Sequence, residues 1–159
     1  SPNLYLQCFY FRNSQKNHIY CNACVDFSYN KKYVDMCYGD LMSTSESLFL
    51  DIPNRSNYNN LKLQSYGENH ENLRFGSEAI TLHKILKKSK APKIIDFLSI
   101  DVEGAEFSVL GGIDFSKYNF KYILVESRVP KKVKSYLSLK GYKFLEKLSD
   151  HDLLFGLNK

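Results

Sequence analysis

The chain has 159 residues, enough for a single domain that buries a core, and we predict one domain over 1–159. Its hydrophobic share of 43% and charged share of 25% exclude extensive disorder. The formal net charge is +5, but the basic residues are interleaved with acids and do not form a stripe with aromatic residues. We therefore expect no nucleic-acid partner, since single-strand binding needs such a stacking platform.

The sequence carries no obvious signal for a membrane or for secretion. No apolar run approaches the roughly 18 residues of a membrane span, and the first residues lack the basic and then apolar layout of a signal peptide. We therefore expect no membrane partner and a cytoplasmic protein.

All four cysteines, Cys8, Cys21, Cys24 and Cys37, lie in the first quarter of the chain. The C-x-x-C formed by Cys21 and Cys24 suggests zinc binding or redox chemistry. The pair lies in a strand-like segment, however, where residues three apart face opposite sides. We expect free buried thiols and no metal site.

The first quarter of the chain predicts one helix and two strands. A helix of about ten residues fits the N-terminus, with Asn3 as a candidate N-cap. A strand is expected from His18 to Phe27, and a second strand from Lys32 to Tyr38 follows a polar turn. The alternation in the second strand favours pairing with the first strand across that turn.

The segment 39–76 is polar and has no clear period. A connection of this length inside a compact domain is either a functional lid or an insertion. Tyr66 and His70, together with Tyr58 and Arg74, are residue types that recognise substrates from loops, or that lie solvated there. We keep Tyr66 and His70 as candidate substrate contacts.

The rest of the chain alternates between helices and apolar strands. The expected elements are a short helix over 82–86 capped by Ser77 or Thr81, a strand over 94–100, a helix over 105–110 with Gly111 and Gly112 at its exit, a strand over 122–125, a helix from Pro130 to Gly141, and strands over 142–148 and 153–157. In the helix after Pro130, we expect Val133, Tyr136, Leu137 and Leu139 on the buried side. The last two strands must be antiparallel neighbours because their link is short. The pattern predicts an open α/β sheet.

The central strand over 94–100 ends abruptly at Asp101, and Glu103, Gly104 and Glu106 follow. Buried parallel strands are near-continuous apolar runs, and ligands bind outside their carboxyl ends. This placement favours a functional site at Asp101 and Glu103. The alternative is that the acids only cap the next helix and solvate its first turn.

The nine residues from Leu98 to Glu106 resemble the signature of the FkbM family of S-adenosylmethionine-dependent methyltransferases. The segments 22–25, 123–126 and 139–142 are similar to further family strings. The resemblance implies a partial Rossmann-like class I methyltransferase sheet, with helices on both faces and a C-terminal antiparallel hairpin. It also implies S-adenosylmethionine as the cofactor.

The family also carries an upstream strand and a Gly-rich turn that hold part of the cofactor, and no counterpart precedes Ser1 and Pro2. We expect the chain to be an N-terminally truncated fragment or a degenerate relative. Two functions stay open. One is methyl transfer to an oxygen of a small molecule or sugar. The other is a non-catalytic α/β module, a fragment or pseudoenzyme that binds a partner.

The resemblance also implies roles for individual residues. Asp101 is the candidate base or acceptor-orienting group and a cofactor contact, and Glu103 is the second catalytic candidate. Asn22 and Ala23 fall where a strand of the family's fold approaches the adenine of the cofactor. Glu126 ends the neighbouring strand and is a candidate substrate contact. Asp101 and Glu103 are two ligands of the type that hard cations prefer, but no third is evident, so we predict no metal site. Glu106 is expected to serve the helix or to pair with a Lys.

Overall fold

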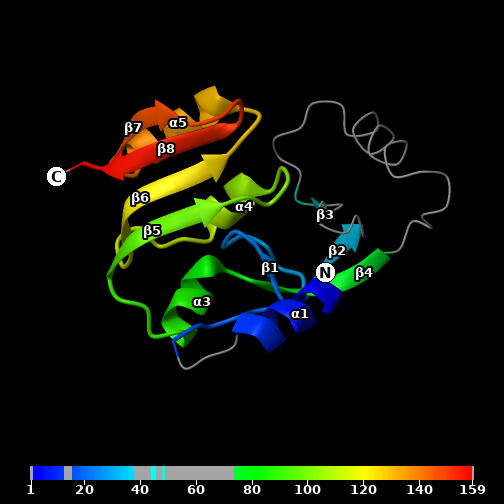
Figure 1. Ribbon diagram of the computed structural model, residues 1–159. Coiled ribbons are helices and arrows are strands. Elements are labelled where there is room, and N and C mark those ends of the chain that lie inside the picture. The colour runs from blue at the N-terminus through cyan, green and yellow to red at the C-terminus, as the bar shows by residue number, and fades with distance from the viewer. Residues whose placement is uncertain (1, 13–15, 38–43, 46–47, 49–73, 159) are drawn as a thin grey trace.

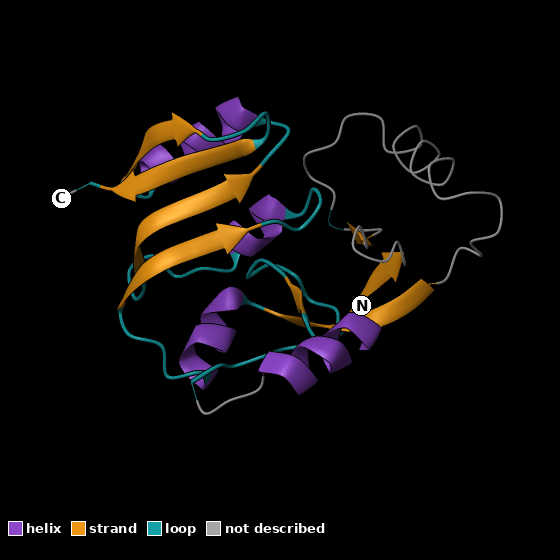
Figure 2. Cartoon of the chain, in the orientation of Figure 1, coloured by secondary structure: helices purple, strands orange, loops and turns teal. Residues whose placement is uncertain are grey.

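The computed structural model describes residues 2–12, 16–37, 44–45, 48 and 74–158 (Figure 1, Figure 2). Its helices are α1 (Pro2–Arg12), α3 (Leu82–Lys88), α4 (Glu106–Gly111) and α5 (Pro130–Leu139). Its strands are β1 (Ala23–Cys24), β2 (Tyr33–Cys37), β3 (Thr44–Ser45), β4 (Arg74–Ile80), β5 (Ile94–Ile100), β6 (Asn119–Glu126), β7 (Tyr142–Lys147) and β8 (Asp152–Leu157). The predicted α/β class is confirmed.

The described strands form two mixed four-stranded sheets, in the orders β1-β4-β2-β3 and β5-β6-β8-β7. The sequence predicted one open sheet, and this is wrong for the described part of the chain. The reason lies in strand pairing, because β5 pairs with β6 but with no strand of the first sheet.

The strand β4 organises the first sheet, and the sequence analysis missed it. It pairs with β1 in parallel and with β2 antiparallel, so it lies between them. The predicted hairpin of the first two strands is therefore wrong. The expected strand over His18–Phe27 is also reduced to Ala23–Cys24, because only Ala23 and Cys24 find ladder partners, at Ala79 and Ile80.

The second sheet carries the predicted central strand and the predicted terminal hairpin. β5 covers Ile94–Ile100 as expected and pairs in parallel with β6. β8 is antiparallel both to β6 and to β7, which confirms the hairpin. The four strands bring the carboxyl ends of β5 and β6 to one edge of the sheet.

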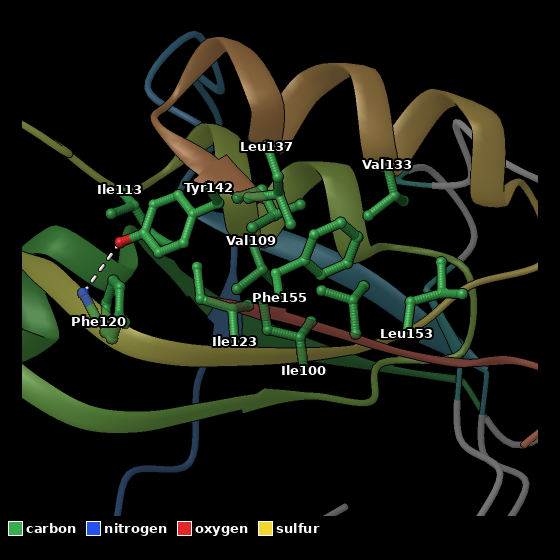
Figure 3. Close-up of a cluster of buried hydrophobic side chains, with 12 residues drawn as sticks. Ile100, Val109, Ile113, Phe120, Ile123, Val133, Leu137, Tyr142, Leu153 and Phe155 are labelled. Atoms are coloured by element: carbon green, nitrogen blue, oxygen red, sulfur yellow. Dashed lines mark hydrogen bonds between the residues drawn. The ribbon is translucent and has the colours of Figure 1, made fainter. Parts of the chain in front are cut away.

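The larger hydrophobic core lies between this sheet and the helices α4 and α5, which cover the same face (Figure 1, Figure 3). Its buried members are Ile100, Val109, Leu110, Ile113, Phe120, Ile123, Val125, Val133, Leu137, Tyr142, Leu153 and Phe155. The buried Tyr142 hydroxyl accepts a hydrogen bond of 2.9 Å from the backbone N–H of Phe120. Apolar packing therefore fixes the strands on which the candidate site is built.

The opposite face of this sheet carries large apolar side chains that stay exposed. Phe97, Tyr122 and Leu145, on three different strands, are 51%, 49% and 40% exposed. The expected cover of helices on both faces is therefore not met for this sheet in the described residues. The continuous apolar pattern of β5 suggests burial on both faces, but one face lacks a covering helix here.

The helix ends agree with the sequence only in part. Asn3, the candidate N-cap of the first helix, lies inside α1, which already begins at Pro2. Thr81 caps α3, with its hydroxyl accepting from the Lys84 N–H at 3.2 Å, whereas the alternative cap Ser77 lies in β4. Pro130 occupies the first turn of α5, and α4 exits through Gly112. Leu139, expected on the buried side of α5, is 86% exposed because it ends the helix beyond the last core contact at Leu137.

The four cysteines are free, as predicted, but none is fully buried. Cys8 and Cys21 are exposed, while Cys24 and Cys37 are half-buried. Burial raises the pKa of the Cys24 thiol above its usual value. In the described part of the chain, no helix is long and apolar enough to cross a membrane.

A smaller core of Val25, Val34, Leu48 and Ala105 joins the first sheet to the turn that precedes α4. The two parts also meet at Gly112, where an added Cβ would lie 2.2 Å from the Val25 carbonyl oxygen. Only glycine permits this close approach. The contact holds the end of β1 against the C-terminal end of α4.

Candidate active site

The parallel pairing of β5 and β6 places two acids at one sheet edge. Ile100 lies opposite Val125 in the register, so the next residues along the two strands are Asp101 and Glu126. Because both strands run the same way, their carboxyl ends open onto the same space. The predicted proximity of Glu126 to Asp101 is therefore observed.

Glu103 joins this pair to form a group of three carboxylates. One carboxylate oxygen each from Asp101, Glu103 and Glu126 lies within 4.8 Å of the others. Oxygen ligands of this kind suit hard divalent cations. The sequence predicts two such ligands and no third, whereas the structure adds Glu126 from the neighbouring strand.

Crowding of like charges changes the acidity of this group. The pKa of Glu126 is raised to about 7, first by hydrogen bonding with the Asp101 carboxylate and then by desolvation. Repulsion from Asp101, Glu103 and Asp152 adds to the rise. Near neutral pH, Glu126 therefore carries a proton for part of the time, and Asp101 accepts the hydrogen bond from it.

The turn after β5 holds one of these acids, Glu103, in an unusual backbone conformation. Glu103 and Gly104 have φ values of 53° and 100°, in or near the left-handed region that disfavours side chains. The buried Glu106, 2% exposed, accepts a hydrogen bond of 2.8 Å from the Gly104 N–H. The observed partner of Glu106 is thus the backbone of the turn and not a Lys.

A pocket of about 550 Å³ opens between the two sheets. Its walls include Asn22 and Ala23 from the first sheet and Asp101 and Glu103 from the turn after β5. The remaining lining residues are Cys24, Met36, Ser45, Leu48, Val102, Ala105 and Val109. The structure therefore brings together four of the predicted site residues from segments about eighty positions apart.

The pocket is chemically divided. The apolar side chains of Met36, Leu48 and Val109 form one part of its wall, and the carboxylates of Asp101 and Glu103 provide negative charge. Small-molecule sites commonly combine an apolar lining with a few polar groups, at volumes of roughly 300–1,000 Å³. This pocket has the size and the chemistry to hold a small molecule that carries a positive charge.

Asn22 is held in place by β4. Its side-chain amide donates to the Glu78 carbonyl oxygen at 3.2 Å and lies 3.5 Å from a carboxylate oxygen of the same residue. Whether Asn22 and Ala23 contact adenine stays a prediction, but both line the pocket that contains Asp101.

Two predicted site residues, Tyr66 and His70, lie outside the described residues, as does most of the proposed lid over 39–76. Two further lining residues, Met36 on β2 and Leu48 after β3, were not predicted from the sequence. The only available signal for Met36 was the alternation in its strand, which predicts one buried face but not the pocket that the face lines.

Comparison with protein families identifies the chain. The model of the FkbM methyltransferase domain matches residues 2–144, which is most of the sequence. The matched region includes Asn22, Asp101 and Glu126. Comparisons with curated proteins and with solved structures found no match. The chain therefore belongs to the FkbM methyltransferase domain family.

Proposed function

We propose that this protein transfers a methyl group from S-adenosylmethionine to an oxygen of a small molecule or sugar. One observation carries the proposal. In a chain of a methyltransferase family, Asn22 and Ala23 at β1 and Asp101 and Glu103 in the turn after β5 line a single pocket. Membership of the family suggests methyl transfer, and this pocket is the proposed site of that reaction.

The residues of the pocket fit a cationic cofactor. When bound, S-adenosylmethionine supplies a methyl group on a positively charged sulfur. The carboxylates of Asp101 and Glu103 complement such a charge, and the apolar wall suits the uncharged part of the molecule. Asn22 and Ala23 would hold the adenosine side of the pocket.

Asp101 is the proposed base. Asp101 would take the proton of the acceptor hydroxyl while S-adenosylmethionine would supply the methyl group and leave as the neutral thioether. Glu126, whose pKa is raised to about 7, lies beside this carboxylate. Glu103 is proposed to orient the acceptor.

The first experiment measures binding by isothermal titration with S-adenosylmethionine and with S-adenosylhomocysteine. Saturable binding of both compounds supports the proposal, and absence of binding supports the non-catalytic module instead. A transfer assay then follows the labelled methyl group onto a panel of sugars and small alcohols.

Replacing Asp101 by Asn removes the base at nearly unchanged volume. We expect kcat to fall by about 100-fold or more, since general base catalysis contributes roughly 10²–10⁴-fold. Asp96→Asn is the matched control, because it removes the same charge five residues earlier, at a solvent-exposed position in β5 that pairs with Lys121. Unchanged transfer by a folded Asp101→Asn variant would rule out the base assignment.

A further inference from the structure

The turn between β5 and α4 includes one residue in an unfavourable backbone conformation. Glu103 has a φ of 53°, which is unfavourable for a residue with a Cβ, and Gly104 follows at 100°. Asp101, Val102, Glu103 and Ala105 all line the pocket. A backbone hydrogen bond of 3.4 Å from the Ala105 N–H to the Val102 carbonyl oxygen spans the turn, and a further interaction that holds this backbone also fixes the shape of the pocket.

Glu106 supplies that interaction. Its carboxylate accepts a hydrogen bond of 2.8 Å from the Gly104 N–H. Backbone hydrogen bonds from Val102 and from Glu106 itself join that of Gly104 in lowering the pKa of this carboxyl, against the dominant rise caused by burial. Glu106 does not line the pocket, so its contacts are with the turn rather than with a ligand.

The burial of Glu106 argues against an ordinary role at a helix start. An acid in the first turn of a helix favours the helix dipole while it remains in water. Glu106 is only 2% exposed, and burying a carboxyl is costly unless hydrogen bonds compensate. The bonds to the turn provide this compensation, which ties the position of the side chain to the shape of the backbone.

We propose that Glu106 is a positioning residue of the active site, whose buried carboxylate fixes the 102–104 backbone so that Asp101 and Glu103 face the pocket. The link to cofactor binding rests on the proposed function. The link to the backbone does not, and it is testable separately.

The test compares two variants of the full chain. Glu106→Gln keeps an oxygen acceptor, and Glu106→Met fills similar space with an adaptable apolar side chain but offers no comparable acceptor. Hydrogen exchange of the Gly104 amide reports on the turn, and titration with S-adenosylmethionine together with kcat and KM reports on the site.

We expect Glu106→Gln to keep slow Gly104 exchange and to change cofactor affinity by less than about threefold. Loss of one hydrogen bond corresponds to roughly tenfold in an equilibrium. Glu106→Met should therefore speed Gly104 exchange and weaken S-adenosylmethionine binding by about tenfold, with a lower kcat as well. If Glu106→Met does not fold, Glu106→Asp tests the same point, because its shorter side chain cannot reach Gly104 in the same way.

Several results would overturn the inference. Unchanged Gly104 exchange in Glu106→Met would show that the carboxylate does not hold the turn. Equal damage from Gln and Met would show that charge, and not the accepted hydrogen bond, matters. If the wild-type protein binds no cofactor, the proposed function fails, but Gly104 exchange still decides whether Glu106 holds the turn.

Discussion

The two sheets differ in how firmly they are packed. In the described residues, the sheet of β5, β6, β8 and β7 shares a core of twelve buried residues with α4 and α5, while the first sheet shares a core of four. In the larger core, the two helices and the hairpin contribute six fully buried apolar side chains: Leu110, Val133, Leu137, Tyr142, Leu153 and Phe155. One member of the smaller core, Ala105, comes from the turn after β5 and not from the first sheet.

This difference corresponds to a division of chemistry. The three carboxylates stand on the firmly packed sheet, where like charges are held close against their repulsion. Asn22 and Ala23 stand on the lightly packed sheet and form the opposite wall of the pocket. We infer that the acidic half of the site is preorganised, and that the other wall depends on contacts between the two sheets.

The largest expected effect tests the packing difference directly. Phe155→Ala should destabilise the protein by about 3–5 kcal/mol, since it empties a fully buried aromatic position in the larger core. Urea unfolding followed by circular dichroism measures the change. Val34→Ala in the smaller core is the comparison, with an expected loss of roughly 2 kcal/mol. Equal losses would contradict the difference between the two cores.

An intermediate effect is expected where the two parts touch. In Gly112→Ala, the added Cβ meets the Val25 carbonyl oxygen at 2.2 Å, so the end of β1 must move. We expect the free energy of unfolding to fall by about 1–3 kcal/mol. Because the pocket wall at β1 is displaced, the affinity for S-adenosylmethionine, measured by titration, should fall at least tenfold.

Gly76→Ala in β4 is the matched control for this substitution. Its Cβ would lie 3.7 Å from the nearest atom, at ordinary contact distance from Tyr33. The control should leave cofactor affinity near that of the wild type. Similar affinities for the two variants would argue that the contact at Gly112 does not shape the pocket.

The smallest expected effect concerns pH. The pKa of Glu126 is about 7 in the folded protein, against 4.5 for the ordinary carboxyl. The folded state therefore binds this proton more tightly, so the stabilisation is full below about pH 4.5 and is lost as the pH rises through about 7. Glu126→Gln should remove this decline, which we expect to be about 1 kcal/mol because the side chain is partly exposed.

Unfolding measured at a series of pH values checks this prediction, with Glu146→Gln, an exposed acid on β7, as the control. The free energy of unfolding of the control should decline with rising pH in parallel with that of the wild type. If Glu126→Gln also runs parallel to the wild type, the carboxylates do not share a proton in the way described.

Much of the second sheet could be predicted because its signals are local. An apolar run ending in an acid gave β5 and Asp101, the glycines after 110 gave the helix exit, and the short link after 148 required an antiparallel hairpin. Even the meeting of Asp101 and Glu126 followed from two parallel strands with acidic ends.

The first sheet could not be predicted in the same way. β1 has only two residues, so its sequence carries almost no periodic signal, and β4 follows a long polar stretch. Its alternation of half-buried and exposed side chains was a usable sign, but nothing in it indicates that β4 would separate β1 from β2. Pairing between distant strands depends on the whole fold.

By itself, the sequence determined the family, the acids at the end of the central strand and the local elements around them. Only the tertiary structure decided that Asn22 and Ala23 face Asp101 across one pocket, that Glu126 completes a group of three carboxylates, and that Glu106 is turned inward onto Gly104. The physical reason is that periodicity and capping act over a few residues. The acidity of Glu126 and the burial of Glu106 arise instead from neighbours that only the folded chain brings close.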